Sequence, residues 1–114
     1  MLNQKEDMDF SSIKNNLKAL NFESIRMETD NYLEAVIVQT EIEKLNFRLK
    51  NIFTDPVFPA NESLEEGLQK TVDSFGGIMQ GQTLYFKNIG VNNVFAMLWP
   101  WRDGIHTTVK IILK

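Results

Sequence analysis

The chain of 114 residues is 43% apolar and 24% charged, carries a net charge of −3 and contains no cysteine. This is one domain's length, so we expect a single domain over residues 1–114, with residues 1–8 frayed. Without cysteine there are no disulfides, thiolate metal sites or thiol catalysis, and the apolar content is that of a globular chain. No apolar run reaches the roughly 20 residues that span a bilayer, and the acidic start is unlike a signal peptide. We therefore expect a cytoplasmic protein without membrane contact.

The first third of the chain predicts a helix followed by two strands. Apolar residues recur every three or four positions over residues 10–20, which indicates a helix that Asp9 or Ser11 would cap. Alternation of apolar and polar residues then predicts a half-buried strand over residues 22–29. After a turn, residues 32–40 are rich in β-branched side chains and predict a second strand.

The segment 41–53 fits two patterns. Its apolar residues alternate like those of a strand, and they also form one helical face. Thr40 and Glu43 have the spacing of a capping box, and acidic residues precede basic ones as the helix dipole favours. These terminal signals favour a helix over Glu41–Phe53.

A loop and a third helix follow. Two prolines in Thr54–Asn61 disfavour both helix and strand, so this segment is predicted as a loop. Ser63 and Glu66 form a second capping box, and the apolar spacing continues to Phe75. The glycine pair after Phe75 ends the helix.

The last third of the chain predicts a three-stranded antiparallel meander. The aromatic stretch Gln82–Trp101 forms a hairpin around a turn at Asn88–Asn93, and a strand over Ile105–Leu113 follows a short turn. Along the second strand two sets of apolar side chains point to opposite faces, so both faces require cover. One set is Val94, Ala96 and Leu98, and the other is Phe95, Met97, Trp99 and Trp101.

The element order is therefore α-β-β-α-α-β-β-β. This order predicts an α+β fold with a mainly antiparallel five-stranded sheet and its helices packed on one face. The opposite face would then be solvated or covered by a partner.

No motif identifies a catalytic or metal site. His106 is the only histidine, and without an activated nucleophile nearby we expect a strand residue rather than a general base. The glutamates at the start of the third helix are explained by capping, so no metal site is expected. Gly76–Gly81 follows a helix rather than preceding one, which is the wrong order for a phosphate-binding loop. We expect no cofactor, and a non-catalytic role is favoured over an enzyme.

The leading hypothesis is an interaction domain that forms a homodimer through the aromatic face of the sheet, because tryptophan, tyrosine, methionine and arginine are enriched at interfaces. One alternative is a pocket for a small molecule or anion between the sheet and the loop 54–61. Another is single-stranded nucleic acid stacked on the sheet, which the net charge and the missing RNA-binding motif make the weaker choice. Residues 77–114 do carry a net charge of +3 against −6 for residues 1–76. The candidate ligand or interface residues are Tyr85, Lys87, Phe95, Met97, Trp99, Trp101, Arg102 and His106.

Overall fold

The computed structural model describes residues 9–58 and 65–114. The expected fraying of residues 1–8 and the capping role of Ser63 lie outside the described residues. In chain order the elements are α1 (Phe10–Lys18), β1 (Ser24–Thr29), β2 (Tyr32–Val38), the short 3-10 helix η2 (Gln39–Glu41), α2 (Ile42–Phe53), α3 (Glu66–Ser74), β3 (Thr83–Ile89), β4 (Asn92–Pro100) and β5 (His106–Leu113).

The five strands form one antiparallel sheet in the order β1-β2-β5-β4-β3. This confirms the predicted α+β class and element order. The two N-terminal strands pair as a hairpin, the C-terminal meander pairs in sequence, and β5 joins the two units at the centre. The sheet edges are consequently β1 and β3. No helix in the described part of the chain is long and apolar enough to cross a membrane.

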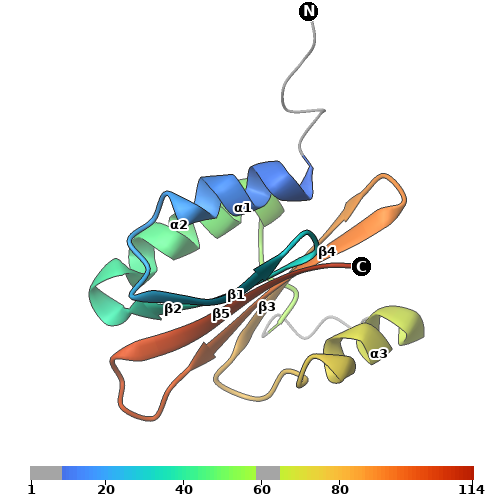
Figure 1. Ribbon diagram of the computed structural model, residues 1–114. Coiled ribbons are helices and arrows are strands. Elements are labelled where there is room, and N and C mark those ends of the chain that lie inside the picture. The colour runs from blue at the N-terminus through green and yellow to red at the C-terminus, as the bar shows by residue number, and fades with distance from the viewer. Residues whose placement is uncertain (1–8, 59–64) are drawn as a thin grey trace, which may run out of the picture.

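The helices lie on both faces of the sheet, which corrects the expectation that they share one face. Figure 1 shows α1 and α2 together on one side and α3 on the other. Helices α1 and α2 bury Leu17 and Leu49 in the larger core cluster, with Val109 of β5. Helix α3 contributes Val72 to a second cluster, with Phe95 of β4. The second face of the sheet is therefore covered within the chain, at least over β4.

The expected cap is confirmed at the start of α1 but not at the start of α2. Asp9 caps α1, since its Oδ1 accepts a hydrogen bond from the backbone N–H of Ser12 at 2.8 Å. The helical interpretation of residues 41–53 is confirmed. The Thr40 capping box is wrong, however, because η2 precedes α2 and the N-cap residue Glu41 makes no side-chain cap bond.

The predicted alternation along β4 is confirmed. Val94, Ala96 and Leu98 belong to the core cluster under α1 and α2, whereas Phe95 and Met97 belong to the cluster under α3. Strand β4 thus supplies buried side chains to both layers, as a two-sided apolar strand should.

Strand β1 departs from the prediction of a half-buried strand, because all six of its residues are exposed. A bulge lies between Ile25, which pairs with Ala35, and Met27, which pairs with Glu34. The extra residue places Ile25 and Met27 on opposite faces of the sheet, so they do not form one buried stripe. The result is an exposed edge strand that carries apolar side chains.

Candidate functional site

The structure separates the predicted site residues between the two faces of the sheet. Tyr85 lies on the α2 side, with its ring centroid 5.8 Å from that of Phe53. Lys87 lies there too, where its Nζ donates to the backbone carbonyl of Ile52 at 3.1 Å. These two residues therefore do not share a surface with the predicted tryptophan face.

Phe95, Met97 and Trp99 lie on the α3 side. Phe95 and Met97 are fully buried in the cluster that includes α3. Trp99 is partly buried, packs against Gly76 and lies beneath Lys110, whose Nζ is 3.6 Å from the ring centroid. Because neither Phe95 nor Met97 is accessible, the centre of the aromatic face is part of the protein core.

Trp101 and His106 remain at the surface, at the end of the sheet. Trp101 is 39% exposed, and its ring centroid lies 4.7 Å from that of His106. The indole Nε1 of Trp101 donates to Oγ1 of Thr108 at 2.8 Å. Arg102 is exposed in the adjoining turn. Of the eight predicted residues, this end of the sheet brings Trp101, Arg102 and His106 together.

His106 is held between two carboxylates. Its Nδ1 lies 2.6 Å from Oδ2 of Asp103, and its Nε2 lies 2.8 Å from Oε1 of Glu23, just before β1. The hydrogen bond to Asp103 raises the pKa of His106, and the charge of Glu23 adds to this effect. Backbone N–H donation from Ile105, together with the His106 side chain, lowers the pKa of Asp103 to about 2. When protonated, the imidazolium donates from both nitrogens and links Asp103 to Glu23 as a clamp, with no free lone pair left on the ring.

Strand β1 forms an open, exposed edge of the sheet. Within residues 9–58 and 65–114, no strand pairs with the outer side of β1. Ile25 and Met27 are 45% and 54% exposed. Glu28 anchors the strand to α1 through Nζ of Lys14 at 3.3 Å and Nζ of Lys18 at 2.8 Å. The edge is thus held in place and presents unpaired backbone groups beside apolar side chains.

The opposite edge, β3, is partly covered by the chain. The backbone N–H of Val57 donates to the carbonyl of Leu84 at 2.9 Å, and the N–H of Leu84 donates to the carbonyl of Phe58 at 3.2 Å. A pocket was expected between the sheet and residues 54–61. At this place Val57 and Phe58 pack against the α3-side core. Residues 59–61 lie outside the described residues.

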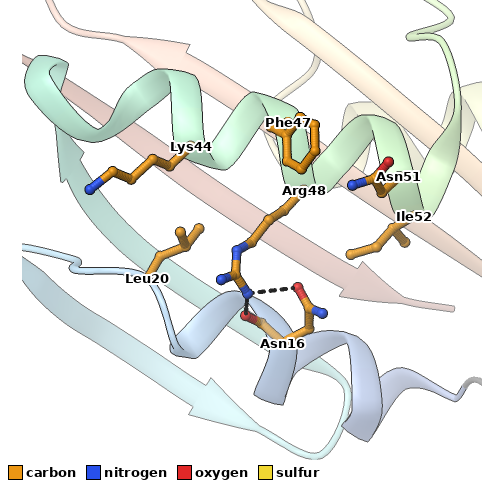
Figure 2. A pocket seen from close by; sticks show the side chains of 7 residues that line it. All are labelled: Asn16, Leu20, Lys44, Phe47, Arg48, Asn51 and Ile52. Carbon is orange, nitrogen blue, oxygen red and sulfur yellow. Dashed lines mark hydrogen bonds between the residues drawn. The ribbon is translucent and has the colours of Figure 1, made fainter.

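A groove that the sequence did not reveal runs between α1 and α2. It has a volume of about 460 Å³, and Figure 2 shows the side chains that line it. The lining residues are Asn16, Leu20, Lys44, Phe47, Arg48, Asn51 and Ile52. They come from α1, from Leu20 just after it and from α2, and the β1–β2 hairpin separates these segments in the sequence, so no motif spacing could have assembled them.

The described residues contain no group of three His, Asp or Glu side chains placed to hold a metal ion. Comparisons with protein-family models, with curated proteins and with solved structures found no match for this chain.

Proposed function

We propose that the protein is a non-catalytic association domain that forms a homodimer by antiparallel pairing of β1 with β1 of a second copy. The observation that carries the proposal is the open, fully exposed edge strand. The proposal keeps the homodimer expected from sequence and moves the interface from the aromatic face to the edge, because Phe95 and Met97 are buried.

The sequence of β1 is self-complementary in one register. If Met27 lies opposite Met27 of the second copy, Arg26 lies opposite Glu28 of that copy, and the reverse pair forms by symmetry. Opposite charges directly across two strands are favourable, and like charges are unfavourable. The strand contains no proline, so every residue of β1 has a backbone N–H donor.

Pairing through β1 gives a closed assembly. The two copies would form one continuous ten-stranded sheet whose outer edges are both β3. Because Val57 and Phe58 already bond to Leu84 of β3, those outer edges are partly blocked. Growth therefore stops at two copies, as expected of a two-fold interface.

Sedimentation velocity over protein concentrations from about 1 µM to about 500 µM tests the proposal in the range of moderate affinities. We expect a concentration-dependent shift from the 13.2 kDa chain to a species of twice that mass. The variant Met27→Lys should remain monomeric, because it places two ammonium groups against each other across the two-fold axis.

Val91→Lys is the matched control, since Val91 is 95% exposed in the β3–β4 turn and the change in charge is the same. Circular dichroism verifies that both variants are folded. A wild-type chain that stays monomeric over the whole range, or a Met27→Lys variant that dimerises like Val91→Lys, would refute the proposal.

A further inference from the structure

The groove between α1 and α2 has the composition of a ligand site rather than of a helix contact. Lys44 lies three and four residues before Phe47 and Arg48, and Asn51 lies four and three residues after them, so α2 directs all four along one face. Phe47 is 68% exposed. The groove therefore presents an exposed aromatic ring beside two cationic side chains.

Arg48 is oriented by α1. Its Nη1 donates to the backbone carbonyl of Asn16 at 2.7 Å and to Oδ1 of the same residue at 3.2 Å. Figure 2 shows the side chain crossing the groove, with its second terminal nitrogen directed to the side where Leu20 and Lys44 lie. In the described part of the chain, Nε and Nη2 of Arg48 donate to no protein acceptor. A guanidinium with two adjacent free donors matches the two oxygens of a carboxylate.

The remaining side chains define the class of ligand. Lys44, whose Nζ pairs with Oε1 of Glu41 at 3.2 Å, lies on the side of Arg48 that carries its free donors, and the apolar side chain of Leu20 lies there too. Phe47 offers a ring face at the rim. A volume of about 460 Å³ is in the range of small-molecule sites.

We propose that this groove binds a small organic carboxylate with an aromatic or aliphatic body. The carboxylate accepts from Nε and Nη2 of Arg48 and from Nζ of Lys44, and the apolar body packs on Leu20 and Phe47. The site lies in the layer formed by α1 and α2 and uses no residue of the β1 edge, so it is independent of the proposed dimer.

The test is an NMR titration of the full chain with 3-phenylpropionate, and with 3-phenylpropanamide as its neutral counterpart. We expect saturable shifts of the Arg48 Nε–H signal and of the Phe47 and Asn51 amides with the carboxylate, and affinity at least about tenfold weaker for the amide. Arg48→Met and Lys44→Met should each weaken carboxylate binding. Lys50→Met is the matched control, since Lys50 lies on α2 outside the groove and should leave affinity unchanged.

Lys44→Met keeps the test decisive if Arg48→Met fails to fold, because Lys44 is exposed and, within residues 9–58 and 65–114, forms an ion pair with Glu41 alone. Equal shifts with the carboxylate and the amide, or equal affinity in Lys44→Met and Lys50→Met, would overturn the proposal. Binding of 3-phenylpropyl phosphate without binding of 3-phenylpropionate would overturn the assignment to carboxylates.

Discussion

The indole ring of Trp99 lies directly against the backbone of Gly76, where α3 ends. A Cβ atom added to Gly76 would lie 2.3 Å from Cη2 of Trp99, and Gly76 has a φ of +111°. This contact fixes α3 to β4 and explains why Trp99 is structural rather than available to a partner. Gly76→Ala should therefore lower the free energy of unfolding by about 3 kcal/mol, from overpacking and backbone strain together.

Chemical denaturation measures this cost, with Gly81→Ala as control. Gly81 also has a positive φ, of +89°, but nothing lies within 4 Å of a Cβ at that position. The control should lose only about 1 kcal/mol, the cost of the left-handed backbone conformation. Equal losses in the two variants would mean that the Trp99 contact does not hold α3 in place.

Lys110 and Lys87 differ in one contact, the cation–π contact with Trp99 that Lys110 alone of the two makes. Lys110 donates to the carbonyl of Phe75 at 3.0 Å and lies over the ring of Trp99, whereas Lys87 donates to the carbonyl of Ile52 without an aromatic partner. Lys110→Met should cost about 1–2 kcal/mol of unfolding free energy, and Lys87→Met about 0.5–1 kcal/mol. Urea denaturation of both variants provides the measurement. A Lys87→Met variant less stable than Lys110→Met would contradict the importance of the cation–π contact.

The clamp at His106 should make stability depend on pH. The pKa of His106 is raised in the folded state, chiefly by its hydrogen bond to Asp103, with the charge of Glu23 adding to the effect. The imidazolium therefore contributes its full stabilisation below the ordinary pKa of 6.5 and loses it as pH rises through the folded-state pKa. The difference in unfolding free energy between wild type and His106→Gln should accordingly shrink as pH rises.

Titration of the His106 ring signals by NMR checks the cause. The wild-type midpoint should lie above 6.5, and Glu23→Gln should lower it because one of the two carboxylate charges is removed. A midpoint at or below 6.5 would contradict the clamp. Asp103 affects stability at acid pH. Because its pKa is lowered from 3.8 to about 2 in the folded state, its carboxylate stabilises the fold above pH 3.8, and this stabilisation is lost as the pH falls towards 2.

The fold was largely predictable because its signals are local. The alternation of Val94, Phe95 and Ala96 correctly separates the side chains of β4 between the two faces of the sheet. The apolar spacing of residues 41–53 identified α2. Both patterns depend only on the period of the backbone, which a single sequence contains.

The candidate sites were not predictable, because they depend on strand order and on one inserted residue. The bulge in β1 leaves Ile25 and Met27 exposed on opposite faces of the sheet. No glycine in β1 indicates this bulge in the sequence. Glu23 reaches His106 only because β2 pairs with β5 across the chain. Trp101 is 39% exposed, whereas Phe95 and Met97 of the predicted aromatic face are core.

The central claim is that β1 of one copy pairs with β1 of another around Met27. Because the chain has no cysteine, Met27→Cys introduces a unique thiol, and facing antiparallel residues lie within the Cα separation that a disulfide spans. Under mild oxidation we expect Met27→Cys to form a covalent dimer rapidly, while Val91→Cys, at a position that is 95% exposed, remains mostly monomeric. Equal cross-linking of the two variants, or none in Met27→Cys, would contradict pairing through β1.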